Sequence, residues 1–482
     1  MNTRTHQLSE RPTTVAKVPP SFCRSRLTFE ARIYAVKELA RRAGVTREFF
    51  DSWTIDADEL HTTISLTPDC QKIYFEHLHD GDLGALASGK IPVGRSPWPQ
   101  NPRNTLLDSD LLTPFARSEP QKVSPLFQRR TDGSFLCQID LLLSLLFTLN
   151  RVEESLCDIC DEHGRFPSSA SLARQHNFLE RPIVDEYGLA FEQVIQAILP
   201  AWQPRPRALR VNLTHDIDDI GIPFQLSTTI AHTVKRRRPV ASLQDLSATF
   251  SKVEPAELAQ VRRLAAISKS RGLVSSFFWK ATPRTTRDSG YDIFHPKVQR
   301  IIADIRVQGC NVGVHPGYDT YQARPKLFEE VQRLRQALGA QQLGGRQHYL
   351  RWSPDTWRDW EACNLHYDSS VGFADHFGFR AGTALPFRPW SFVDNRELDL
   401  VEVPLILMDC TPVKYMSLPK QEAITRIRQC INRTALVGGV FTLLWHNTPL
   451  LDPAYRGWYE SILDLLPSAC SFDVPGTTHT LW

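Results

Sequence analysis

The feature that most constrains the fold of this 482-residue chain is a regular alternation of apolar runs and amphipathic segments after residue 206. Most gaps between the runs can hold a helix with an apolar stripe, as in "PKLFEEVQRLRQALG" at 325–339. Strands and helices in alternation predict a parallel sheet with right-handed crossovers. Seven strands predict a closed or nearly closed β/α barrel, with its chemistry at the carboxyl ends of the strands. The seven runs are residues 209–214, 273–279, 310–314, 343–349, 366–371, 399–407 and 438–445.

The first 205 residues lack this regularity and predict an α+β accessory domain at 26–205, after a polar, Pro-rich tail at 1–25 that we expect to be disordered. The spacing at 29–44 predicts an amphipathic helix, "LHTTISL" at 60–66 alternates like a strand, and 138–156 predicts a buried helix. The Pro-rich segment 89–118 predicts a long loop or linker. A second Pro-rich stretch, "AWQPRPRA" at 201–208, marks the boundary with a barrel domain at 206–482.

Charge and hydropathy exclude several classes of protein. With 56 basic and 53 acidic side chains, the net charge of +3 gives no general sign of binding to nucleic acid or a membrane surface. The basic run "KRRRP" at 235–239 is expected to be a solvated loop. No apolar signal region opens the chain and no run approaches the roughly 20 apolar residues that span a bilayer, so we expect a cytoplasmic protein. The ten cysteines are scattered, and the pair Cys157 and Cys160 is expected to be reduced.

Titratable side chains collect at the ends of the predicted strands. They are Asp216, Asp218 and Asp219 after the first strand, His315 and Asp319 after the third, Arg346, His348 and Tyr349 in the fourth, Asp368 in the fifth and His446 after the seventh. A carboxylate of the first strand, His315 and one of Asp319 or His348 would make a site for a divalent metal, with zinc as the expected ion. Such an ion would offset the repulsion within the acid cluster. It would also make hydroxide available at neutral pH.

Five fragments in this region, residues 209–450, resemble the motifs of polysaccharide deacetylases, carbohydrate esterase family four, in a divergent branch with a Thr-His-Asp-x-Asp first motif. The fragments are "THDIDD", "HPGYD", "RQHY", "YDSS" and "LWH", in the order that the family has. The resemblance implies a distorted (β/α)7 barrel, which agrees with the strand count. It also implies a hydrolase that removes an N-acetyl group from a sugar or a sugar-containing precursor.

Carried over residue by residue, the resemblance implies a set of roles. They are Asp216 as general base, Asp218 and His315 as metal ligands, Arg346 as the group that orients the base, Asp368 as the partner of His446, and His446 as general acid. The inserted Ile217 leaves a second register, in which Asp218 is the base and Asp219 the ligand. Strand alternation favours the first register, because it places Asp216 and Asp218 on one face. The third ligand stays open between Asp319 and His348.

Substrate contacts are expected from Tyr349, Trp445 and Arg380. Arg380 belongs to a loop rich in Gly, Arg and aromatic residues at 378–390, which also carries Trp390 and which could equally be an ordinary structured loop. The expected partner is a carbohydrate, and the accessory domain would restrict it, for example to a nucleotide- or lipid-linked sugar. One alternative function is a related hydrolase of a ureide or cyclic amide. Another is a carbohydrate-binding protein that has lost its metal.

Overall fold

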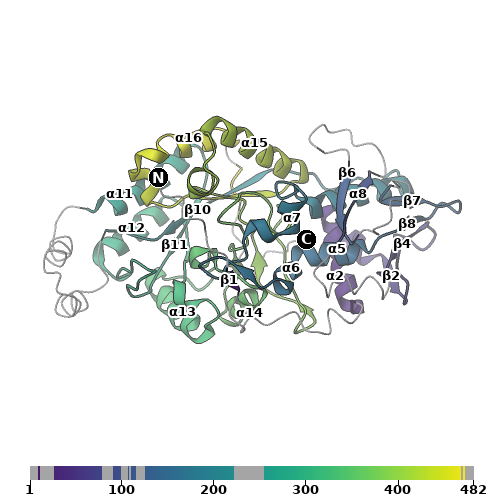
Figure 1. The fold of residues 1–482 in the computed structure, drawn as a ribbon, viewed down its shortest axis with the longest axis horizontal. Coiled ribbons are helices and arrows are strands. Elements are labelled where there is room, and N and C mark those ends of the chain that lie inside the picture. Colours follow the sequence, from purple (N-terminus) through teal and green to yellow (C-terminus); the bar gives the residue numbers. More distant parts are fainter. Residues whose placement is uncertain are drawn as a thin grey trace.

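The structure is a computed structural model that describes residues 9–10, 27–78, 91–98, 107, 110–115, 125–221, 254–467 and 470–472. In Figure 1 the elements of the first 205 residues, in purple and blue, lie mainly on the right, and those of the later residues lie mainly on the left. One apolar cluster includes residues from both regions, for example Leu39 and Phe191 from the first and Leu213 and Leu443 from the second. The two regions therefore share an interior.

A parallel array of strands forms the centre of the later region. Its spatial order is β17 (Leu407–Met408), β18 (Val440–Leu444), β10 (Arg210–Ile217), β11 (Ser275–Trp279) and β12 (Asn311–Val314). Parallel bridges through Gly345 continue from β12 to β13 (Tyr367–Asp368), which pairs with β16 (Val401–Glu402). Each of the seven predicted runs contains strand or bridge residues, so the predicted α/β class with parallel strands is confirmed.

Residues 401–408 connect the two ends of this array. The backbone N–H of Val403 donates to the carbonyl of Asp368, in β13. Three residues later, the N–H of Ile406 donates to the carbonyl of Thr442 in β18. Residues 401–408 therefore pair with β13 near their start and with β18 near their end.

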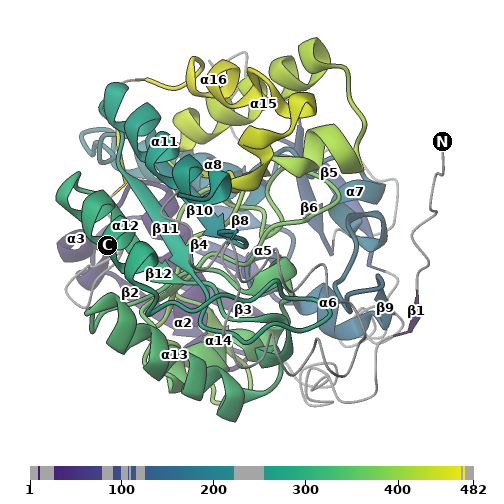
Figure 2. The ribbon, with the colours of Figure 1, turned by 90° about the vertical axis from the view of Figure 1, so that its left-hand side faces the viewer.

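Helices cover the outside of the array, as Figure 2 shows. They are α11 (Ala256–Ser270), α12 (Pro296–Val307), α13 (Arg324–Leu338), α14 (Pro354–Ala362), α15 (Lys420–Val437) and α16 (Trp458–Leu463). In α13 the apolar stripe Leu327, Val331 and Leu334 is buried, which stabilises the fold by about 1.5 to 3 kcal/mol for each side chain. Proline in its first turn and Gly339, left-handed at φ 58°, set its two ends.

The first region contains a five-stranded sheet with helices. The sheet has the order β2 (Thr54–Ala57), β3 (His61–Ser65), β4 (Lys72–Glu76), β8 (Phe135–Cys137) and β7 (Phe127–Arg129). The main helices are α2 (Phe29–Arg42), α5 (Leu141–Leu149), α6 (Val152–Leu156) and α8 (Ile183–Ile198). The predicted helix at 29–44 and strand at 60–66 are confirmed. The helix predicted at 138–156 is split at Arg151, whose left-handed backbone (φ 51°) accompanies ion pairs to Glu153 and Glu154.

Two expectations about the first 118 residues meet the structure only in part. The segment 89–118 is not simply a linker, because β5 (Val93–Pro97) and β6 (Asp110–Pro114) form an antiparallel pair within it. Each strand ends at its proline, where a missing N–H is tolerated, so proline content misled the prediction. Of the tail, only the two-residue strand β1 (Ser9–Glu10), paired with β9 (Ile159–Cys160), is described. The basic run 235–239 lies outside the described residues.

A buried ion pair within the first region anchors the loop at 372–390. Arg42 Nε lies 2.9 Å from Asp185 Oδ1, and Asp185 Oδ2 accepts the backbone N–H of Ala384 at 2.7 Å. Breaking such a pair costs about 3 to 5 kcal/mol, because a buried charge is left alone. Cys157 is half-buried and Cys160 is buried. Among the described helices, none has both the length and the apolar character needed to cross a bilayer.

Candidate metal centre

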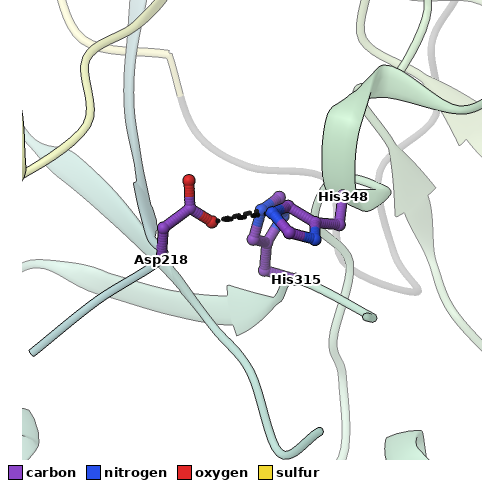
Figure 3. Close-up of side chains that lie close together, drawn as sticks. All are labelled: Asp218, His315 and His348. Atoms are coloured by element: carbon purple, nitrogen blue, oxygen red, sulfur yellow. Dashed lines mark ion pairs between the residues drawn. The ribbon is translucent and has the colours of Figure 1, made fainter. Parts of the chain in front are cut away.

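Three side chains from separate loops converge at the carboxyl end of the array. Asp218 follows β10, His315 follows β12 and His348 begins η3 (His348–Leu350). One ligand atom from each lies within 4.8 Å of the others. Asp218 Oδ1 is 3.2 Å from His315 Nε2 and 3.2 Å from His348 Nε2. Figure 3 shows the carboxylate pointing at the two imidazole rings.

Both imidazole rings are held through their Nδ1 atoms. His315 Nδ1 lies 2.7 Å from the carbonyl oxygen of Arg346, and His348 Nδ1 lies 2.7 Å from Asp288 Oδ1. Because each Nδ1 faces an acceptor, a neutral ring would carry its proton there, and its Nε2 would offer a lone pair to an ion bound at Asp218. Metal-binding histidines in proteins are commonly oriented in this way.

The three residues fit a divalent ion. His315 Nε2 is buried and makes no well-aligned hydrogen bond to another described residue, and buried Asp218 Oδ1 has ion-pair contacts, to His315, His348 and Lys280. Buried polar atoms of this kind usually have a partner. Burial raises the pKa of Asp218, but Lys280, His348 and then His315 outweigh burial and hold it well below its usual range. An ionised carboxylate and two imidazoles form a donor set typical of zinc with an open coordination position.

Asp216 lies beside this cluster and is fixed by an arginine. Its side chain is buried, and Arg346 Nη1 donates to its Oδ1 at 2.9 Å. Arg346 is itself held by Thr214 Oγ1 and by Ser369. Asp219 takes no part, because its Oδ1 accepts the N–H of Gly221. The structure thus brings Asp218, and not Asp219, to His315 and His348, as the alternation along β10 predicts.

His446 contacts Asp409 instead of the predicted Asp368. Its Nδ1 lies 3.0 Å from Asp409 Oδ2, and its Nε2 lies 3.6 Å from Asp218 Oδ2. Burial lowers the pKa of His446, but Asp409, followed by Asp218 and Asp216, outweighs burial and raises it to about 9. At neutral pH the ring is therefore an imidazolium, with Nε2 directed at the cluster.

The Asp368 prediction was wrong for a topological reason. β17 pairs directly with β18, so Asp409 after β17 reaches His446 after β18. Asp368 lies in β13, which neighbours the Gly345 bridge and β16, and its Oδ1 accepts hydrogen bonds from Ser370. Burial raises the pKa of Asp368 to about 7. The sequence does offer one indication of Asp409 as the partner of His446, because Asp409 lies two residues after the predicted strand 399–407.

A cavity of about 510 Å³ opens over the cluster. This volume lies within the usual range for small-molecule sites, about 300 to 1,000 Å³. Its lining includes the three candidate ligands with Asp216 and His446, and on the other wall Arg165, Tyr349, Lys414, Tyr415 and Tyr455. Arg165 comes from the first region, and its guanidinium donates to the carbonyl of Tyr349 at 3.0 Å and to Asp161 at 2.7 Å. Both regions of the chain therefore build the cavity.

Of the predicted substrate contacts, Tyr349 lies in this cavity. Its backbone is left-handed at φ 61°, a conformation that costs energy in a non-glycine residue and is enriched at functional sites. Trp445 is fully buried against Tyr455 and Tyr459, so its prediction as a contact was wrong. Trp390 is also buried, against Tyr34.

Arg380 and Asp319 are placed away from the cluster. Arg380 is 2% exposed and donates two hydrogen bonds to Glu154, at 2.9 and 2.6 Å. It therefore joins the two regions and does not line the large cavity. Asp319 is exposed in η2 (Tyr318–Thr320), because the chain turns outward after Pro316. The structure brings His348, and not Asp319, next to Asp218 and His315.

Sequence reasoning missed two further charged residues here. Lys280 directly follows β11, so it shares the strand-end position of the predicted ligands. Burial lowers its pKa, but Asp218 and Asp288 outweigh burial and raise it. Asp288 lies in an irregular loop, and its neighbours in the sequence carry no pattern that points to it. It accepts the N–H of Tyr318 at 3.0 Å, which fixes its carboxylate beside His348.

Comparisons with known proteins add the following. Residues 90–200 match DUF7033, a family of unknown function. No protein with a curated description matches this chain. A solved structure from Mycobacterium smegmatis, provisionally described as a polysaccharide deacetylase, is similar at 16% identity and a TM-score of 0.36, over 55% of this chain and 85% of that one. Another from Bordetella bronchiseptica, provisionally described as a polysaccharide deacetylase involved in O-antigen biosynthesis, is similar at 17% identity and a TM-score of 0.27, over 53% and 79%.

Proposed function

We propose that this chain is a metal-dependent hydrolase that removes an N-acetyl group from a sugar or a sugar-containing precursor. The observation that carries the proposal is the convergence of Asp218 Oδ1, His315 Nε2 and His348 Nε2 on one centre, below a cavity that Asp216 and His446 also line. The five motif fragments supply the reaction class. The pairing of residues 401–408 at both ends of the array supports a distorted seven-stranded barrel with an accessory domain at 26–205.

Asp218, His315 and His348 would hold the ion, and zinc suits their donor set. When bound, a divalent ion polarises a carbonyl and lowers the pKa of a water molecule toward about 7. Asp216 is the base in this proposal. Arg346 occupies its Oδ1, which leaves Oδ2 to accept the proton of the attacking water.

His446 is the acid in this proposal. The leaving group of an acetamide is an amine, which must be protonated as the C–N bond breaks, because otherwise the intermediate expels water again. His446 carries a proton at neutral pH, Asp409 fixes its Nδ1, and its Nε2 faces the cluster. Positioned acid–base groups of this kind contribute about 10²- to 10⁴-fold to a rate.

We also propose that the accessory domain selects the substrate. It contributes Arg165 to the wall of the cavity, and Lys414 adds a second positive charge there. These cations favour a sugar joined to a phosphate over a neutral sugar. Competition between an N-acetylhexosamine and its 1-phosphate for the same enzyme should favour the phosphate. Equal kcat/KM values for both would contradict this part of the proposal.

Metal analysis with acetate release tests the main proposal. Wild type should contain about one equivalent of metal and release acetate from an N-acetylated sugar. Asp218→Ala, His315→Ala and His348→Ala should lose the metal, whereas Asp319→Ala is a matched control that should keep it. Asp216→Asn should keep the metal and lose activity. The proposal would be refuted if the wild-type protein bound no zinc, nickel or cobalt. Hydrolysis of cyclic amides, without acetate release from N-acetylated sugars, would favour the alternative C–N hydrolase.

A further inference from the structure

Lys280 is a buried cation inside the candidate metal centre, and the mechanism above does not use it. It is 1% exposed. Its Nζ lies 3.0 Å from Asp218 Oδ1 and 3.3 Å from His348 Nε2. These are two of the three atoms that would bind the ion. The ammonium therefore occupies the same ligand atoms that a metal requires.

A second carboxylate also faces this ammonium. Asp288 Oδ1 lies 3.5 Å from Nζ, and the same oxygen holds His348 Nδ1. Without a metal, Lys280 thus balances the charge of Asp218 and Asp288 together. Its backbone is fixed, because its N–H donates to the hydroxyl of Tyr291 at 2.9 Å. Its side chain has four rotatable methylene groups, so the ammonium can move while the backbone stays in place.

The ammonium and a bound ion would compete at these positions. Metal–oxygen bonds to zinc are about 2.0 to 2.2 Å long, so an ion on Asp218 Oδ1 would lie at most about 5 Å from Nζ at its present place. Two cations at this separation in a buried site repel each other strongly. His348 Nε2 also has one lone pair, which either accepts from Lys280 or binds the metal.

We propose that Lys280 is an internal counter-ion that competes with the metal for Asp218 and His348. Metal binding then requires the ammonium to leave Asp218 Oδ1. The chain holds its metal more weakly than the same three ligands would without the lysine, and its folded state tolerates loss of the metal. This inference rests on the metal site of the proposed function.

Metal affinity of neutral variants tests the inference. Zinc and cobalt binding to EDTA-treated protein can be measured by competition with a chromophoric chelator. Lys280→Met and Lys280→Gln should bind each metal at least about tenfold more tightly than wild type, which corresponds to about 1.4 kcal/mol. Their metal-free forms should melt at a lower temperature than wild type, because Asp218 and Asp288 lose their counter-ion. Lys414→Met, which removes an exposed lysine of the same cavity, should leave metal affinity within about twofold of wild type.

Each outcome decides the question. Equal or weaker metal binding by both Lys280 variants overturns the inference and leaves the proposed function standing. Absence of metal binding by wild type and variants overturns both. If neither variant folds, crystal structures of wild type with and without zinc decide. An Nζ still about 3 Å from Asp218 Oδ1 beside bound zinc would overturn the inference, and an ammonium that has moved away would support it.

Discussion

Replacing Asp409 with asparagine removes the carboxylate that holds His446 as an imidazolium. Asp409 Oδ1 and Oδ2 lie 3.1 and 3.0 Å from His446 Nδ1, and Oδ2 also accepts the backbone N–H of His446 at 2.7 Å. Asparagine has nearly the same shape and keeps one acceptor oxygen. The variant therefore changes mainly the charge.

The size of the effect follows from the pKa of His446. The difference between its value of about 9 and the ordinary 6.5 corresponds to about 3 kcal/mol of preference for the imidazolium. The side chain is 17% exposed, so solvent screens this interaction little. Asp409 is the largest cause that opposes burial, and we expect Asp409→Asn to bring the pKa to 6.5 or lower. At pH 8 the protonated fraction would then fall about 30-fold, with an equal loss of rate.

The same pKa links pH to stability. Because folding raises the pKa of His446, the stabilisation is fully present below about pH 6.5 and is lost as pH rises through about 9. Asp409→Asn should lack this contribution at every pH. The measurement is an NMR titration of the His446 ring in metal-free protein, together with a pH profile of acetate release in which the variant recovers toward pH 6.

Asp368→Asn is the matched control, since Asp368 is also buried but contacts Ser370. It should leave the titration of His446 unchanged. The reasoning is refuted if Asp409→Asn leaves the pKa of His446 near 9, or if Asp368→Asn lowers it as much.

Three further predictions concern the surroundings of the site. Asp288→Asn should weaken zinc binding about 10- to 100-fold by calorimetry, because His348 loses the carboxylate that orients its ring; unchanged affinity would contradict this. Arg380→Met should lower the free energy of unfolding by about 1.5 to 3 kcal/mol in urea, since buried Glu154 loses two charge-assisted hydrogen bonds and keeps its ion pair with Arg151, and an effect on KM alone would argue against that role. Burial raises the pKa of Glu38, but two flanking arginines outweigh burial and lower it to about 2, so its stabilisation is present above pH 4.5 and lost as pH falls toward 2. Glu38→Gln should flatten the acid limb of the unfolding curve, and an unaltered limb would refute this.

The parts of the fold and site that could be predicted are those that depend on local periodicity. Apolar runs separated by helical stripes predict parallel strands, and parallel strands bring their carboxyl ends to one edge. This is why the sequence could group Asp218 and His315, with the third position open between Asp319 and His348, and the structure brings His348 to them. The choice of Asp216 over Asp219 as a neighbour of the cluster needed only the two-residue period of a strand.

The residues that could not be predicted depend on lateral order and burial. Asp368 and Asp409 both follow apolar runs, and only the pairing of β17 with β18 decides which one meets His446. Trp445 and Arg380 have side chains typical of sugar-binding sites, but packing places both in the interior. The loop conformation that brings Asp288 to His348 depends on contacts distant in the chain, such as its hydrogen bond from Tyr318.

The interior that the two regions share has a consequence for folding and engineering. A fragment that contains only the residues on one side of position 206 would expose part of the shared apolar core to water. In the first region alone, Arg42 and Asp185 would also lose their hydrogen bonds to Thr383 and Ala384. We therefore expect each region to need the other in order to fold stably. A new specificity is therefore better sought by substituting side chains around Arg165 in the intact chain, because exchanging the whole first region would also exchange its part of the shared core.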